Sequence, residues 1–337
     1  MANPAGNYNV YVSSLNLASV NVATSQDRGT TFSQVPVVAG LPLDDREWIA
    51  AAGATTALLT YHDITTDNID VLRSDDSGTT FVQTARAIPD RDYTAQNNEL
   101  GNIVIDHRNP APGDSFYAYQ SFVAPQNPND SNLDEAFVAV SADGGSTFTD
   151  RPIPCSYTPG KDLDHNFPNV SVAPDGTLWC AWSDDTAVNT AVSHDHGQTR
   201  ACSGNVATGL KRGIFPWLAA TSAGVGVVFY ATPDATGPNM TWYAELAQNP
   251  SATTSGWGAP VRITSVHRGD VCEGGISCTG GRQLLDDFGV DTDQSGWAHI
   301  AYSHDAPDLG GTGTYTGYAV QTSGKRLDSE LIGPTGG

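Results

Sequence analysis

Short apolar runs recur along the whole chain, and residues that favour turns separate them. Typical runs are 57–61, 69–72, 178–182 and 225–230. Runs of this length bounded by Gly, Pro, Asn, Asp or Ser predict β-strands, and no long helical pattern competes with them. We therefore expect an all-β protein built from many short strands.

One eight-residue phrase occurs four times among these runs. It reads S-x-D-x-G-x-T followed by an aromatic residue, which Arg200 replaces in the last copy. In such a phrase Asp accepts hydrogen bonds from backbone N–H groups, and Gly takes a positive φ that other residues resist. Each copy predicts a tight turn between two antiparallel strands, after which the aromatic residue re-enters a strand and packs inward. The copies are Ser25–Phe32, Ser74–Phe81, Ser141–Phe148 and Ser193–Arg200.

The copies begin at residues 25, 74, 141 and 193, so their starts are 49, 67 and 52 residues apart. A period near fifty residues with several strands per repeat is typical of a β-propeller blade, which buries its faces by stacking on its neighbours. We expect a single domain over residues 1–337, an all-β, six-bladed β-propeller of four-stranded antiparallel blades. The first blade shows three strands, so either upstream sequence or the segment 325–332 completes it. The approximate blades are 8–40, 45–88, 97–153, 165–205, 213–262 and 283–332.

The repeated phrase resembles the Asp-box of the sialidase and BNR-repeat propellers. Two further phrases, Asp-Arg-Glu-Trp-Ile-Ala at 45–50 and Leu-Asp-Asp-Phe at 285–288, are similar to secreted bacterial proteins of that superfamily. The resemblance implies a propeller that cleaves a glycan. In true sialidases three arginines hold the sugar carboxylate, a tyrosine activated by glutamate attacks, and an aspartate is the acid. Arg46, Arg212 and Arg282 come from three loops and suit such a triad, but the family's Arg-Ile-Pro motif is absent before the first copy, and no tyrosine can be assigned as nucleophile.

The charge of the chain argues against some partners. It has 37 Asp and Glu against 16 Lys and Arg, a net charge of −21. Such a surface repels nucleic acid and anionic membranes, and no run reaches the roughly twenty apolar residues of a membrane helix. The N-terminal sequence lacks the charged and apolar stretches of a signal peptide. Because of the resemblance to secreted proteins, we expect a secreted or extracellular monomer whose signal has been removed.

Five cysteines leave at least one unpaired. Cys272 and Cys278 bracket the loop Glu-Gly-Gly-Ile-Ser, which could close as a local disulfide. Cys180 lies in an apolar run and is expected to be buried in a strand. The pairing of Cys155 and Cys202 stays open, and the Cys and His spacings of zinc sites are not found.

Charged residues and histidines gather in two sets of loops. If the repeated turns join the third and fourth strands, the loops that enter each first strand and those between second and third strands lie together on the opposite face. These loops hold more charge than turn formation requires, although Asp and Asn are also ordinary turn residues. The expected catalytic residues are Asp45, Glu99, His165 and Asp287, and the expected substrate-binding residues are Arg46, Arg212, Arg282, His62 and Asp286.

Three kinds of function could use these loops. Paired carboxylates could hydrolyse a glycosidic bond, and Glu99 is the first to test. The oxygens of Glu99, Asn98, Asn166, Asp287 and Asp164 would also suit calcium, in a cation-dependent hydrolase or lyase. A non-catalytic, lectin-like propeller is the third alternative, but the entering loops differ between blades, which favours one composite site. We expect a sialidase-like glycoside hydrolase that acts on a carbohydrate or glycoconjugate, with no cofactor assigned.

Overall fold

The structure is a computed structural model that describes residues 6–16, 19–37, 43–111, 115–221, 223–251, 253–274, 278–279, 283–284, 288–305 and 313–327. The chain divides into two compact units, Met1–Pro154 and Cys155–Gly337. They are called the N-terminal unit and the C-terminal unit below, and each is described by itself. Within the described ranges, none of the helices is long and apolar enough to cross a membrane.

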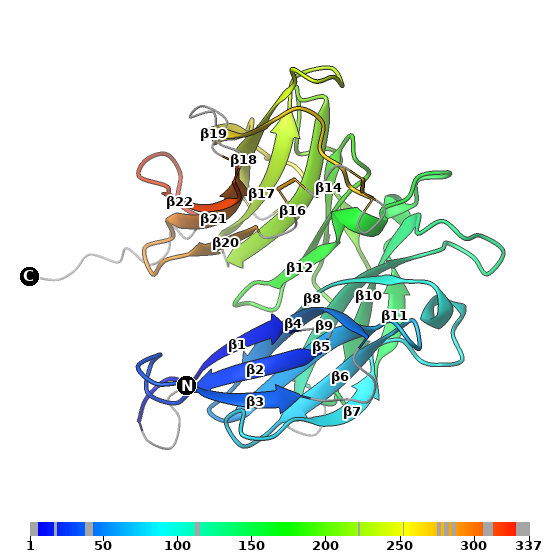
Figure 1. Cartoon of the computed structure of the whole chain (residues 1–337), viewed down its shortest axis with the longest axis vertical. Helices are drawn as coiled ribbons and strands as arrows, with labels where there is room; N and C mark the ends of the chain where they lie inside the picture. Colours follow the sequence, from blue (N-terminus) through cyan, green and yellow to red (C-terminus); the bar gives the residue numbers. More distant parts are fainter. Residues whose placement is uncertain are drawn as a thin grey trace, which may run out of the picture. The chain divides into compact units, whose positions relative to one another are not determined.

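The N-terminal unit contains three antiparallel sheets, coloured blue to green in Figure 1. In each sheet the strands pair in chain order, and a 3-10 helix, η1 (Tyr93–Gln96), precedes the third sheet. The first sheet is β1 (Val10–Leu15), β2 (Val20–Ser25) and β3 (Ser33–Val37); the second is β4 (Asp44–Ala52), β5 (Thr56–Asp63), β6 (Asn68–Ser74) and β7 (Val82–Arg86); the third is β8 (Glu99–Ala111), β9 (Ser115–Ala124), β10 (Glu135–Ser141) and β11 (Thr149–Pro152).

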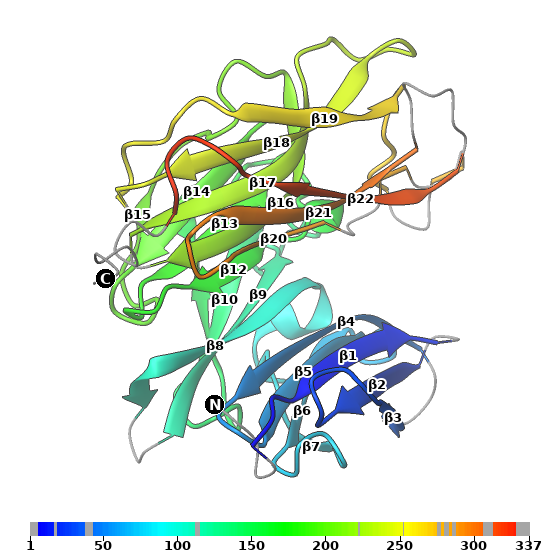
Figure 2. The same cartoon turned by 90° about the vertical axis from the view of Figure 1, so that its left-hand side faces the viewer.

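The C-terminal unit repeats the same arrangement, as Figure 2 shows in green to red. Two 3-10 helices, η2 (Pro154–Ser156) and η3 (Asp164–Asn166), precede its first sheet. The first sheet is β12 (Asn169–Val172), β13 (Leu178–Ser183), β14 (Val188–Ser193) and β15 (Ala201–Cys202); the second is β16 (Arg212–Thr221), β17 (Gly224–Thr232), β18 (Thr241–Asn249) and β19 (Val261–Arg268); the third is β20 (Gly289–Thr292), β21 (Ala298–His304) and β22 (Tyr315–Val320).

Neighbouring sheets within each unit contact one another through their first strands. β4 contacts both β1 and β8, and β16 contacts both β12 and β20. Apolar side chains fill the space between the sheets: Leu58, Leu100 and Phe122 are fully buried in the core of the second and third sheets. Within each unit, neighbouring sheets bury their facing sides against each other, as the blades of a propeller do. The predicted fold class, an all-β six-bladed β-propeller of antiparallel blades, is confirmed, with three strands described in the first and the sixth sheet.

The four S-x-D-x-G-x-T phrases form turns of one geometry. In the second copy Ser74 Oγ accepts a hydrogen bond from the Gly78 N–H at 2.9 Å, and Gly78 has a φ of 78°. Asp76 accepts bonds from the Thr80 N–H at 2.9 Å and from the Thr80 hydroxyl at 2.7 Å. The same three bonds recur in the other copies. The prediction of turns between the last two strands of a sheet is confirmed.

The aromatic residue after the turn behaves differently in different sheets. Phe148 is buried in the core of the second and third sheets, and Phe81 packs against the core of the first and second sheets. The prediction of inward packing is wrong for Phe32, a residue that is 49% exposed. Phe32 belongs to the first sheet, and the described part of this unit has no earlier sheet for its ring to pack against.

The cysteines pair within the C-terminal unit. The local disulfide between Cys272 and Cys278 is confirmed. A second disulfide joins Cys155 to Cys202, a pairing that the sequence left open. Cys180 is free and buried on β13, as predicted.

Candidate functional site

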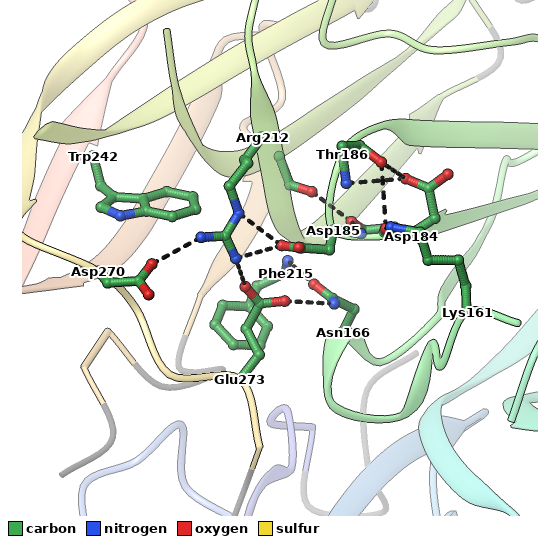
Figure 3. Close-up of polar contacts among 12 residues, drawn as sticks. Lys161, Asn166, Asp184, Asp185, Thr186, Arg212, Phe215, Trp242, Asp270 and Glu273 are labelled. Carbon is green, nitrogen blue, oxygen red and sulfur yellow. Dashed lines mark hydrogen bonds and ion pairs between the residues drawn. The ribbon is translucent and has the colours of Figure 1, made fainter. Parts of the chain in front are cut away.

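The candidate site lies in the C-terminal unit, where the segments that precede β12 and β16 meet those that follow β13 and β19. Antiparallel pairing in chain order brings these strand ends to one edge of the sheets. A cleft of about 500 Å³ opens there, and Figure 3 shows its polar contacts. The charged and amide side chains that line it are Lys161, Asp162, Asp164, Asn166, Asp184, Asp185, Arg212 and Glu273.

Arg212, the first residue of β16, joins the acidic side chains of this cleft. Its side chain is 14% exposed. Nε and Nη2 donate to Asp185 Oδ1 at 2.9 and 2.5 Å, Nη1 donates to Asp270 Oδ1 at 2.9 Å, and Nη2 also donates to Glu273 Oε1. The guanidinium lies over the ring of Trp242, 5.0 Å from its centroid. One cation thus holds carboxylates from two different loops, because its planar fork can bond several oxygens at once.

Glu273 reaches this cation from the loop after β19. Its other carboxylate oxygen, Oε2, accepts a hydrogen bond at 2.9 Å from Nδ2 of Asn166, a residue that is 4% exposed (Figure 3). The residue before it, Cys272, forms the disulfide with Cys278. Glu273 is therefore bonded at both oxygens and lies beside a covalent crosslink.

Asp185 reaches Arg212 from the turn after β13. It has a φ of 71°, and its N–H donates to Ser183 Oγ at 2.9 Å. The Ser183 hydroxyl in turn donates to the Gly213 carbonyl oxygen on β16. This chain of bonds fixes the turn of one sheet against the first strand of the next, which orients the Asp185 carboxylate.

Burial and charge change the acidity of Glu273. Burial, together with the negative charge of Asp185, raises the pKa of Glu273 to about 8, although Arg212 and Asn166 oppose the shift. Burial alone would lower the pKa of Arg212, but its bonds to Asp185 and its charged neighbours raise it. Near neutral pH the cleft therefore holds a protonated carboxylic acid, Glu273, beside the acidic side chain of Asp185 and a permanent cation. A protonated acid next to a carboxylate is the usual requirement for acid–base catalysis.

The first strands near the cleft begin with strained backbone. Phe167, just before β12, has a φ of 34°, and Phe215 in β16 has a φ of 51° beside a shift of register between Ile214 and Trp217. Bulky residues rarely adopt a positive φ, and such positions concentrate at functional sites. The two phenyl rings stack with centroids 6.3 Å apart, and the Phe215 N–H donates to Asn166 Oδ1 at 3.4 Å. The strained backbone at Phe215 thus supports Asn166, the residue whose side chain donates to Glu273.

Three of the predicted residues lie together in the N-terminal unit. Asp45 pairs with His62 across β4 and β5, and Arg46 follows with a φ of 49° at a shift of register. His62 is 7% exposed, its Nε2 lies 3.6 Å from Asp67 Oδ1, and burial lowers the pKa of its imidazole. These residues are adjacent, and their predicted roles stay predictions.

Glu99 begins β8 in the same unit. The preceding residue, Asn98, donates to the backbone carbonyl of Asp67 at 2.5 Å. This bond ties the loop that enters the third sheet to the turn that follows His62. The structure therefore places the segments of His62 and Glu99 side by side, at the edge where entering loops were predicted to gather.

The remaining predicted residues are only partly described. Arg282, Asp286 and Asp287 lie outside the described residues. The backbone of His165 belongs to η3, but its side chain is outside the description. In the described part of the chain, no group of three or more His, Cys, Asp or Glu side chains could hold a metal ion.

Asp185 and Glu273, the two acidic residues that share Nη2 of Arg212, were not among the predicted site residues. Asp185 received no predicted role, and Glu273 was considered only as part of the loop between Cys272 and Cys278. Glu273 could have been found from its position, because a carboxylate next to a crosslinked cysteine has a restricted backbone. Its partner Arg212 was predicted as a substrate-binding residue, which stays a prediction.

Comparisons with known proteins establish only the fold. No family model matches this sequence, and no curated protein matches it. An α-L-arabinofuranosidase from Fusarium graminearum is similar in structure, with a TM-score of 0.51 and 11% identity over 92% of this chain and 84% of its own. An α-L-arabinanase from Penicillium chrysogenum has a TM-score of 0.50 and 13% identity over 89% and 80% of the two chains. An exo-β-1,3-galactanase from Clostridium thermocellum has a TM-score of 0.44 and 14% identity over 81% of this chain, which spans 57% of that protein's chain.

Proposed function

We propose that the protein is a glycoside hydrolase that cleaves a neutral glycan in the cleft of the C-terminal unit. The observation that carries this proposal is the pair formed by Glu273 and Asp185 on the guanidinium of Arg212. Two similar solved structures are an arabinofuranosidase and an arabinanase by name, which is a reason to test glycans first.

Glu273 and Asp185 have different roles in the proposed hydrolysis. Glu273, which keeps its proton near neutral pH, donates that proton to the glycosidic oxygen as the bond breaks. Asp185 attacks the anomeric carbon to form a covalent glycosyl-enzyme as the glycosidic bond breaks, and water then hydrolyses the glycosyl-enzyme with the deprotonated Glu273 as base. Oxygens of both residues bond to the same Nη2 atom, so these two oxygens lie at most about 5 Å apart, which is less than the roughly 6.5–9.5 Å between the carboxyl groups of inverting enzymes. Asp185 is therefore assigned as the nucleophile, and the anomeric configuration is retained.

The same geometry favours a neutral sugar over sialic acid. The bonds of Arg212 to three acidic side chains occupy four of the five N–H groups of a guanidinium. The cleft lining also contains five carboxyl groups against Lys161 and Arg212. An anionic sugar would meet repulsion there unless other arginines dominate. The sialidase activity that the sequence suggested is thus a narrower alternative.

A release assay tests this function. We would incubate the protein with arabino-oligosaccharides, β-1,3-galacto-oligosaccharides, sialosides and acidic polysaccharides, with and without chelator. We expect release from a neutral glycan, insensitivity to chelator, and a first-formed product of retained configuration by proton NMR. Release from sialosides alone would establish the sialidase alternative. Binding without release would establish the lectin-like alternative, and loss of release with chelator would establish a cation-dependent enzyme.

A further inference from the structure

A second cavity lies in the N-terminal unit, at the edge of the sheets that carries the S-x-D-x-G-x-T turns. Its volume is about 330 Å³. The first turn lies beside it, because the Arg28 N–H donates to the Tyr8 carbonyl at 3.3 Å, and the second lies beside it, because the Ser77 N–H donates to the Thr55 carbonyl at 2.9 Å. We call this cavity the tyrosine pocket, after Tyr8 and Tyr11 in its wall.

The chemistry of the tyrosine pocket differs from that of the chain as a whole. The chain has 37 acidic residues, but the residues that line the pocket include no carboxylate. Its wall combines aromatic rings, an amide, an imidazole and a backbone turn. The residues that supply these groups are Tyr8, Asn9, Tyr11, Gly53, Ala54 and His107.

The polar groups of the pocket are held in place. Asn9 Nδ2 donates to Tyr11 Oη at 2.9 Å and to the backbone carbonyl of Ala54 at 3.0 Å. Tyr8 is 56% exposed, and the Arg28 guanidinium lies over its ring, 5.2 Å from the centroid. The pocket therefore presents an accessible ring beside an amide whose orientation is fixed.

The repeated turn of the neighbouring sheet fixes Tyr11. A Cβ atom on Gly78 would lie 2.7 Å from Tyr11 Cε1 and 2.5 Å from Thr24 Oγ1, so the turn packs directly against that ring. The Thr24 hydroxyl also donates to the Gly78 carbonyl at 3.3 Å. Tyr11 packs against the core of the first and second sheets as well. A ring held on these sides loses little conformational freedom when a ligand arrives.

We propose that the tyrosine pocket binds one sugar unit of a neutral glycan, as a binding site separate from the cleft. The apolar face of a sugar ring packs against an aromatic ring, and its hydroxyl groups bond to amide, imidazole and backbone groups. The lining residues include no carboxylate that a ligand would have to desolvate or neutralise, so they suit an uncharged ligand, and the Arg28 guanidinium lies beside them over the Tyr8 ring. The choice of a sugar as ligand rests on the proposed function; the location and the uncharged character of the site do not.

Residue-resolved NMR tests this site separately from the cleft. We would titrate the protein with lactose, cellobiose and xylobiose and follow the amide signals of Gly53 and Ala54 for the pocket, and the side-chain amide of Asn166 for the cleft. We expect at least one disaccharide to shift the Gly53 and Ala54 signals. Tyr8→Ala should weaken that binding at least fivefold, and Tyr8→Phe should largely keep it. Tyr157→Ala is the matched control, because Tyr157 is a 39% exposed tyrosine outside the pocket.

The outcomes distinguish this proposal from the proposed function. Shifts at Gly53 and Ala54 without hydrolysis in the release assay would support the pocket and reject the enzyme. Shifts at Asn166 alone would support the cleft and overturn the pocket. Binding that Tyr8→Ala and Tyr157→Ala weaken equally would also overturn the pocket.

Discussion

The acidic cleft of the C-terminal unit and the tyrosine pocket of the N-terminal unit are built on opposite principles. The cleft gathers carboxylates around one guanidinium, and it takes Asp185 and Glu273 from loops. The pocket excludes carboxylates from its lining and takes Tyr11 from a strand and Gly53 from a tight turn. Loops allow residues distant in sequence to converge on one reacting bond, whereas strands and turns offer a rigid wall. The comparison therefore indicates chemistry in the cleft and binding in the pocket.

The largest expected effect that separates the two regions comes from Glu273→Gln. Glutamine keeps the size of the side chain and its bond to Asn166 but cannot donate the acid proton. We expect kcat to fall by about 10² to 10⁴, the usual contribution of a general acid, while disaccharide binding in the pocket is unchanged. Initial rates on the best substrate of the release assay measure this effect.

Two matched variants make this prediction decisive. Asp270→Asn changes another partner of Arg212, but Asp270 has a 60% exposed side chain and no assigned role in the chemistry, so its rate should fall far less. Glu99→Gln tests the carboxylate that the sequence put first. If Glu99→Gln abolishes turnover and Glu273→Gln leaves it intact, the chemistry belongs to the N-terminal unit.

A smaller effect is expected when the crosslink beside Glu273 is removed. In the double variant Cys272→Ser, Cys278→Ser, the described part of the loop has no strand or helix to hold Glu273, so we expect kcat to fall about tenfold and pocket binding to persist. The control is Cys155→Ser, Cys202→Ser. The Cys155–Cys202 disulfide spans a sequence separation of 47, whereas the Cys272–Cys278 disulfide spans 6. The chain-entropy relation assigns a stabilisation of about 4 kcal/mol to the longer loop and about 2 kcal/mol to the shorter one. The variant without the Cys155–Cys202 disulfide should lose more thermal stability, yet keep more activity, than the variant without the Cys272–Cys278 disulfide. If the Cys272→Ser, Cys278→Ser variant keeps the higher activity instead, the local disulfide only stabilises the fold.

The pH dependence of the rate sharpens the comparison further. The pKa of Glu273 is raised to about 8, so the acid is protonated below that pH and loses its proton above it. We expect kcat/KM to fall on the basic side with an apparent pKa near 8, about tenfold for each further pH unit. Binding in the pocket should not follow this curve. A profile that stays flat up to pH 9 would contradict the role of Glu273 as acid.

The repeated turn made most of the fold predictable from the sequence. Its Asp and Gly have local reasons for their identity, since Asp76 accepts the bonds of the following residues and Gly78 needs a positive φ. Local chemistry of this kind can be recognised in a short phrase. The spacing between the copies of the phrase then predicts the approximate bounds of the blades. The exposed ring of Phe32 was missed because its surroundings depend on which sheets lie next to it, and a local phrase does not encode that.

The candidate site was less predictable, because it depends on contacts between distant loops. Arg212 was recognised from its loop, but its three carboxylate partners become visible only when the sheets are packed. Glu273 lies 61 residues from Arg212 in the sequence and 107 from Asn166. A cysteine pair indicates that a loop is closed, but it does not indicate which side chain the loop delivers or to which partner.

The smallest expected effect lies within a single turn and separates fold stability from binding in the pocket. Asp76→Ala removes the acceptor of the Thr80 bonds, which should cost about 1 kcal/mol and lower Tm by about 2–4 °C. Gly78→Ala introduces a Cβ at a φ of 78° against Tyr11 and Thr24, so it should also lower Tm and, in addition, displace the Tyr11 ring. Thermal unfolding measures the stability of the fold, and the NMR titration measures binding in the pocket.

Both variants should keep the turnover of the cleft, and Gly78→Ala should weaken disaccharide binding in the pocket several-fold more than Asp76→Ala does. If the two variants bind equally well, the turn supports the fold alone and Tyr11 is not part of a binding wall.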